Sequence, residues 1–413
     1  MDVCACGQVR HDGAVSGTPH LGTGPGTRMS TRLVGIDLAR LVAVVGMMAA
    51  HTLHFGEQAP SAAVVALIDG PPSTLFAVLG GASVVLAARA RLAVGDRGGA
   101  VRSTLARGVV VVLLGLLVIP LAAAVYVVLV PFGAAIMAAA VLVLLPTWVL
   151  ALLAVLLAAG SGWVAAVARL QLPGLEGGHS LALLLTDPLA SLNDVLLSGV
   201  YPALTWAAYL LIGMLVARAI LAARRAGRER LALAVIGGAG AVLAAAGVAA
   251  SELGVRLLAE DGDVDRARDV LLANAYGAVP SAEPAWQLLA APHSGTPADI
   301  ARTAGIALAV IAVLSLLASL LPASAARLME PLRAAGAAPL TIYVVHVVLL
   351  TMLGGTLGSV PGVVGWAGLA VQVAVALGIG AVLAATRSRG PLERLVGWLA
   401  EAAAGRPAPA REA

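Results

Sequence analysis

Lysine is missing from this sequence, and all 26 of its basic residues are arginine. A chain without lysine cannot form a lysine Schiff base and cannot carry the lysine of a phosphate-binding P-loop. Cysteine is nearly absent as well, because the only two, Cys4 and Cys6, lie in a polar, glycine-rich leader. The rest of the chain therefore offers no thiolate nucleophile, thiolate metal site or disulfide.

Charged and aromatic residues are scarce too, at 12% and 3% of the 413 residues. A soluble globular protein carries about 25% charged residues. Here 60% of the residues are hydrophobic, and they form uncharged runs such as 109–168, 231–250 and 303–326. Runs of this kind suit helices that cross a bilayer, which need about 20 apolar residues each. Few aromatics leave Ala, Val, Leu and Gly to pack these helices, and small residues allow close backbone approach.

The sequence thus predicts an all-α, polytopic integral membrane helix bundle with about ten transmembrane helices. Residues 1–29 are expected to be a disordered leader or a mis-assigned start, because Met29 directly precedes the first span. Residues 30–390 would form the transmembrane domain, and residues 391–413 a cytoplasmic tail. We place the spans at roughly 33–54, 73–92, 105–124, 126–146, 147–168, 200–222, 231–251, 302–322, 338–355 and 362–385.

Arginine is distributed unevenly between the two sets of loops. It clusters before the first span and after the second, sixth, eighth and tenth spans, which all fall on one side. By the positive-inside rule, that side and both termini are cytoplasmic in a multi-pass cell membrane protein. The opposite loops are neutral or acidic, and the longest, about 252–301, is expected to pack as an outer lid with a short helix near 265–276. Spread over short loops, the net charge of +4 gives no patch for nucleic acid.

The first span combines charge at one end with histidine at the other. Asp37 and Arg40 are three residues apart and can pair on one helix face. Arg40 and His51 are eleven apart, so they share a face about 16 Å apart along the axis. A snorkelling Arg–Asp anchor with an interfacial histidine is the plain alternative. Ionisable residues inside spans are costly and are usually functional. His54 is expected to be interfacial.

This first-span pattern, Arg32-x4-Asp37-x2-Arg40 followed by His51, resembles a signature of membrane acyltransferases. The similar groups are the heparan-α-glucosaminide N-acetyltransferase-like proteins, the YeiB-like proteins and the acyltransferase type-three family. Leu41 departs from the glycine that those families usually have. Four further segments resemble them in order, over about residues 30–385, the third being typical of an actinobacterial branch: 74–83 (TLFAVLGGAS), 198–209 (SGVYPALTWAAY), 291–297 (APHSGTP) and 338–346 (APLTIYVVH).

The resemblance implies transfer of an acyl group, expected to be acetyl, from cytoplasmic acyl-CoA to an outer sugar or cell-envelope acceptor. Arg32 and Arg40, with Asp37, would bind the donor's phosphates, and no metal would be required. His51 would be the catalytic base, and His293 a second base. An acyl-histidine intermediate stays open. Membrane lipids and the acceptor would be the partners, and a homo-oligomer is also open.

The remaining candidate residues would bind the acceptor, and each also has a structural explanation. His293, Ser294 and Thr296 lie in a turn that can hold a histidine rigidly, although a solvent-facing loop is equally compatible. His346 in the ninth span is expected to face the bundle, where a structural hydrogen bond would also explain it. Tyr201 and Trp206 fit an acceptor site or an aromatic belt.

Three other functions remain compatible with the sequence. A transporter or flippase would also embed Arg, Asp and His, but no inverted repeat is recognisable. A polyprenyl-phosphate glycosyltransferase would use carboxylates in the first outer loop, where Glu57 and Asp69 are isolated. A scaffold without catalysis would tolerate alanine at His51, His293 and His346.

The predicted orientation can be tested by chemical labelling. A variant lacking Cys4 and Cys6 and carrying Ala282→Cys should react with a membrane-impermeant maleimide in intact cells, because residue 282 belongs to the outer loop. Labelling that occurs only after permeabilisation would reverse the assigned topology.

Overall fold

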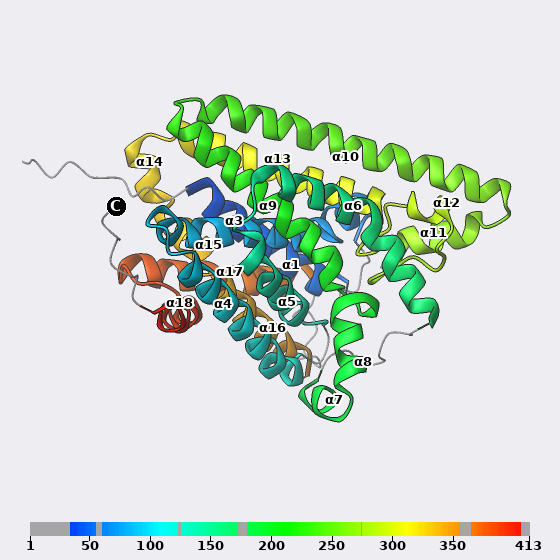
Figure 1. Cartoon of the computed structure of the whole chain (residues 1–413), viewed down its shortest axis with the longest axis horizontal. Helices are drawn as coiled ribbons and strands as arrows, with labels where there is room; N and C mark the ends of the chain where they lie inside the picture. The colour runs from blue at the N-terminus through cyan, green and yellow to red at the C-terminus, as the bar shows by residue number, and fades with distance from the viewer. Residues whose placement is uncertain are drawn as a thin grey trace, which may run out of the picture. The chain divides into compact units, whose positions relative to one another are not determined.

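The computed structural model describes residues 34–54, 60–122, 125–171, 180–273, 275–355 and 365–405. Within these ranges every regular element is a helix, so the predicted all-α membrane bundle is confirmed (Figure 1). Arg32, Glu57 and the leader with Cys4 and Cys6 lie outside the described residues. The main helices are α1 (Val34–Leu53), α3 (Pro71–Ala93), α4 (Arg97–Val118), α5 (Leu129–Leu142), α6 (Thr147–Gln171), α9 (Ala203–Arg225), α10 (Glu229–Glu260), α13 (Pro297–Leu320), α16 (Pro339–Gly355) and α17 (Gly365–Ala385).

Eight of the described helices are long and apolar enough to cross a membrane. The helices α15 (Glu330–Gly336) and α16 meet at a bend of 79°, the geometry of a broken span or a re-entrant loop, and count as a ninth span only if they are taken together. The helix α5, placed where a span at 126–146 is predicted, has only 14 residues. At 1.5 Å per residue it measures about 21 Å, short of a hydrocarbon core of ~30 Å. Where about ten spans are predicted, the described residues thus hold eight helices of spanning length, one bent helix pair and one short apolar helix.

The outer segment is shorter than the sequence predicts. The helix α10 has 32 residues and runs to Glu260, whereas the predicted span ends at residue 251. Its last turns are charged, and a helix that projects beyond the hydrocarbon can carry Glu252 and Arg256 at no cost. With α13 starting at Pro297, residues 261–296 remain. They contain α11 (Val264–Leu272), near the predicted helix, and a small core around Trp286.

The C-terminal segment is also more structured than a tail. Helix α18 (Pro391–Ala404) packs against α4, and its Glu401 forms an ion pair of 2.6 Å with Arg91 of α3. The carboxylate of Glu393 accepts hydrogen bonds from the backbone N–H groups of Leu340 and Thr341, at 2.7 and 3.0 Å. It thereby caps the free donors at the start of α16.

The helix α1 lies inside the bundle, with α3, α13, α15, α16 and α17 packed against it (Figure 1). One of these neighbours, α3, packs closely against α9 through small residues. A side-chain carbon at Gly81 of α3 would collide with the carbonyl oxygen of Leu210 in α9, and one at Gly213 would collide with that of Val78. The two helices therefore touch backbone to backbone, which fixes α3 beside α1.

This contact predicts a measurable loss of stability. Gly81→Ala should lower the free energy of unfolding by about 1–3 kcal/mol, because the added methyl group forces α3 and α9 apart. Gly238→Ala in α10 is the matched control, since nothing lies within 4 Å of its position. The control should be neutral or stabilising by about 0.5–1 kcal/mol, as alanine favours helix. Equal thermal midpoints for the two variants in detergent would contradict the close contact.

Candidate active site

One end of α1 carries a charge cluster. The guanidinium of Arg40 donates to the Asp37 carboxylate at 2.6 Å and to the Ser83 hydroxyl at 2.9 Å. Asp37 also pairs with Arg333 of α15 at 3.3 Å, and Arg333 donates to Glu330 at 2.8 Å. Two cations thus face two carboxylates. The predicted Asp37–Arg40 pair forms, and the structure adds Arg333, which the sequence pattern did not single out.

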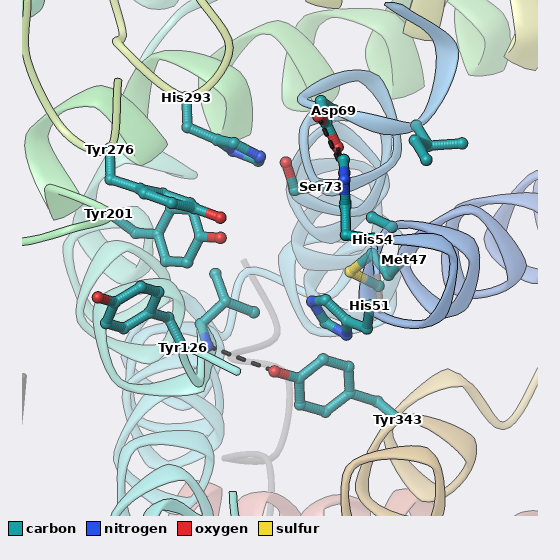
Figure 2. Close-up of a pocket in the computed structure, with 13 residues that line it drawn as sticks. Met47, His51, His54, Asp69, Ser73, Tyr126, Tyr201, Tyr276, His293 and Tyr343 are labelled. Carbon is teal, nitrogen blue, oxygen red and sulfur yellow. Dashed lines mark hydrogen bonds and ion pairs between the residues drawn. The ribbon is translucent and has the colours of Figure 1, made fainter. Parts of the chain in front are cut away.

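The other end of α1 opens into a cavity of about 500 Å³, part of it open to solvent. Figure 2 shows His51 of α1 and His54, which follows it, on one side, with Tyr126, Tyr201 and Tyr276 across the cavity. The polar side chains that line it come from α1, the start of α3, the segments before α5, α9 and α13, and α16: His51, His54, Asp69, Ser73, Tyr126, Tyr201, Tyr276, His293 and Tyr343.

His51 is held from behind by a second histidine. Its Nδ1 lies 2.8 Å from Nε2 of His346 in α16, and the two rings are within 6° of parallel. His346 is 1% exposed and does not line the cavity. His51 therefore presents its other nitrogen, Nε2, to the cavity. The structure places His346 behind the predicted base rather than against an acceptor.

His54 follows α1 and forms a pair with Asp69, the residue that ends α2 (Ala62–Ile68). Its Nε2 lies 3.0 and 3.2 Å from the two carboxylate oxygens (Figure 2). Asp69 is 3% exposed, and its backbone carbonyl accepts from Arg302 of α13 at 3.3 Å. A buried carboxylate that orients an imidazole is a common arrangement in acid–base sites. His54 is thus a cavity residue and not a plain interfacial one.

His293 reaches the cavity from a tightly held turn. Its backbone φ is 62°, in the left-handed region, and Gly295 follows at 66°. Ser294 is fully buried and donates to the carbonyl of Ala291 at 2.8 Å. Thr296 caps α13 by accepting from the N–H of Asp299, and it donates to the carbonyl of Leu289 at 2.6 Å. Ser294 and Thr296 therefore hold the turn and do not line the cavity.

The buried position of His293 in this turn affects the protonation of its ring. Burial, with the nearby Arg302 as a second cause, lowers the pKa of His293 from 6.5 to about 4. The ring is therefore neutral at physiological pH and can accept a proton. It is parallel to the ring of Tyr276 within 16°, with centroids 5.2 Å apart.

Aromatic rings form the wall opposite α1. Tyr201 meets Tyr276 and His293 edge to face, at centroid separations of 5.9 and 5.4 Å. Trp206 of α9 lies behind Tyr201 at 5.8 Å and is 4% exposed. It lines a second hollow that shares Ser73, Tyr201 and His293 with the cavity. Tyr201 is thus placed at the cavity itself, and Trp206 one layer deeper.

This arrangement is suited to moving protons. Imidazoles from two parts of the chain face one space, together with tyrosine and serine hydroxyls that can donate to a bound oxygen. Among the described residues, no three His, Cys, Asp or Glu side chains are grouped so that they could hold a metal ion.

Some residues of this site were predicted from sequence patterns. His51, His293 and Tyr201, named from the sequence, meet at the cavity, whereas Arg40 and Asp37 lie at the far end of α1. His54 could have been included because it stands three residues after His51, on the same helix face. Asp69, Tyr276 and Arg302 give no such signal, since only the fold brings them to α1.

Comparison with known proteins places the chain in a family. A search of curated proteins finds no significant match. A family model described as an acyltransferase domain matches residues 33–385, from the start of α1 to the end of α17. Because this match covers most of the chain and every helix that forms the cavity, the protein belongs to this family of membrane acyltransferases.

Proposed function

We propose that this protein moves an acyl group, expected to be acetyl, from cytoplasmic acyl-CoA to a sugar or other cell-envelope acceptor outside. The observation that carries the proposal is α1 itself. One unbroken helix bears Asp37 and Arg40 near its N-terminal end, where Arg333 of α15 joins them, and opens at its C-terminal end into a cavity with three histidines. With the predicted orientation, the first end faces the donor and the second faces the acceptor.

The acceptor end supports proton transfer from a hydroxyl or amine. In this proposal Nε2 of His51 takes the proton while the acceptor oxygen or nitrogen attacks the thioester carbonyl. The carbon–sulfur bond breaks, and the CoA thiolate leaves and takes up the proton. The tyrosine wall suits a ring with both apolar faces and hydroxyl edges, which is the character of a sugar.

The charge cluster at the donor end fits two roles, binding of the donor's phosphates and structural anchoring of α1. Arg40 has five N–H donors, and its contacts with Asp37 and Ser83 leave others for an anionic phosphate. The cluster is balanced in charge, which is also what a structural anchor requires. Arg32 is proposed as a second donor contact from the sequence alone. The finer kinship with the heparan-α-glucosaminide N-acetyltransferase-like and YeiB-like proteins remains a proposal based on the five segments.

Turnover by the purified protein tests the proposal. In lipid nanodiscs it should release free CoA thiol from acetyl-CoA when a suitable sugar from an acceptor panel is present. His51→Ala should lower this rate by about 10²–10⁴-fold, the usual cost of losing a general base. Thermal stability and CoA binding should stay near those of the parent protein.

His54→Ala and His293→Ala are the comparison variants, because both rings line the same cavity. If either is inactive while His51→Ala keeps most of its activity, the base is that residue and not His51. If all three variants remain active, acyl transfer at this cavity is refuted.

Arg40→Lys separates donor binding from anchoring. Lysine keeps the charge but loses the forked geometry, so affinity for acyl-CoA should fall about tenfold, corresponding to the loss of one charge-assisted hydrogen bond. The affinity is measured by calorimetry alongside the thermal midpoint. A lower midpoint with unchanged CoA affinity would show that Arg40 serves only as an anchor for α1.

A further inference from the structure

The bond between His51 and His346 has unusually regular geometry. The ring centroids are 5.1 Å apart, and the bonded nitrogens are 2.8 Å apart. The centroid separation exceeds the nitrogen–nitrogen distance by two imidazole ring radii, so the hydrogen bond lies along the line that joins the two ring centres. With the ring planes within 6° of each other, the two rings are coplanar and edge to edge, not stacked. One nitrogen must then donate and the other must accept.

Behind His346 lies a third polar side chain. Gln372 of α17 is 1% exposed and is within interaction range of the His346 ring. Nδ1 of His346 and both amide atoms of Gln372 have no hydrogen-bond partner among the described residues. Buried polar atoms without partners are costly, particularly inside a membrane. Three such atoms on two interacting side chains point to a hydrogen bond between His346 and Gln372.

We propose that His346 and Gln372 are positioning residues that fix the tautomer of His51. This inference rests on the proposed function for one point only, namely that Nε2 of His51 is the nitrogen that takes up a proton. His51 Nδ1–H donates to Nε2 of His346, and Nδ1–H of His346 is directed to the amide oxygen of Gln372. The Nε2 lone pair of His51 is then free to face the cavity, as a general base requires.

The three side chains His51, His346 and Gln372 together form a hydrogen-bonded relay. This relay also accounts for the positive charge that forms on His51 during acyl transfer. When Nε2 of His51 takes the acceptor's proton, His51 becomes a cation, and its Nδ1–H bond to His346 strengthens. The dipole of the Gln372 amide, with its oxygen toward His346, stabilises the same charge. When the CoA thiolate leaves, it takes the proton from Nε2, and the three side chains return to their starting state.

Nitrogen NMR tests the relay without relying on catalysis. In protein labelled with ¹⁵N-histidine, the His51 signals are those lost in His51→Gln. We expect a protonated Nδ1, a bare Nε2 and a coupling across the hydrogen bond to His346. His346→Leu should convert His51 to a mixture of tautomers. A proton on Nε2 in the parent protein, or an unchanged His51 spectrum in His346→Leu, would overturn the relay.

Kinetics give a second readout that a purely structural role would not produce. His346→Leu should lower kcat about 10²-fold while KM for acyl-CoA stays near the parent value. His346→Gln should restore much of kcat, because its amide oxygen can replace Nε2 as the acceptor. Gln372→Leu should lower kcat about tenfold. No difference between His346→Leu and His346→Gln would contradict the tautomer role.

The matched control is Gln287→Leu in α12 (Pro284–Gln287). Gln287 is also a buried amide whose oxygen has no partner among the described residues, and it lies outside the relay. Its rate should stay within about twofold of the parent, and an equal loss in this variant would contradict a specific role for Gln372. If the parent protein shows no acyl transfer while the NMR result holds, the proposed function fails and the hydrogen-bonded relay stands.

Discussion

Polar groups inside a membrane bundle must find their partners within the protein, because hydrocarbon offers none. The helix α1 carries this burden more than any other described helix that crosses the bundle. Asp37, Arg40 and His51 all lie on it, and each is met by a side chain from another helix. The partners come from α15, α3 and α16. The position of α1 is therefore fixed by polar pairing at both ends and by apolar packing between them.

The packing around α1 follows from small residues. Backbone contact between α3 and α9 at Gly81 and Gly213 brings these helices closer than larger side chains would allow. The start of α3 then delivers Asp69 and Ser73 to the cavity, and the start of α9 delivers Tyr201. The turn at His293 closes the opposite side, tied to α13 through Asp299, which accepts from the N–H of Gly295 at 3.2 Å. The lining is completed by Tyr126 before α5 and Tyr343 of α16, so one cavity depends on six separate parts of the chain.

The two ends of α1 differ in chemical character. The charge cluster is mutually satisfied and has the composition of an anchor, whereas the histidine end combines imidazole rings, hydroxyl groups and open space. Acyl transfer across a membrane needs both a place for an anionic donor and a base for an acceptor. For the second requirement the proposed function uses the histidines that line the cavity. The first rests on Arg40, whose spare donors must compete with its existing bonds.

The sequence alone determined the helical class, the approximate position of each span and the chemistry at the two ends of α1. These features follow from local properties: hydrophobic run length, and the 3.6-residue period that puts Arg40 and His51 on one face. It also selected His293 and Tyr201, because their motifs are local.

Tertiary structure decided which histidine has which partner. His346 lies 295 residues from His51, and Gln372 is further still, so no spacing rule connects them. His54 and Asp69 are only 15 residues apart, yet their pairing is likewise visible only in the fold. The bend between α15 and α16 and the extension of α10 to Glu260 also came from the structure and not from the predicted spans. The local sequence determines which side chains a helix carries on each face. Only the assembled bundle determines which residues of other helices those side chains contact.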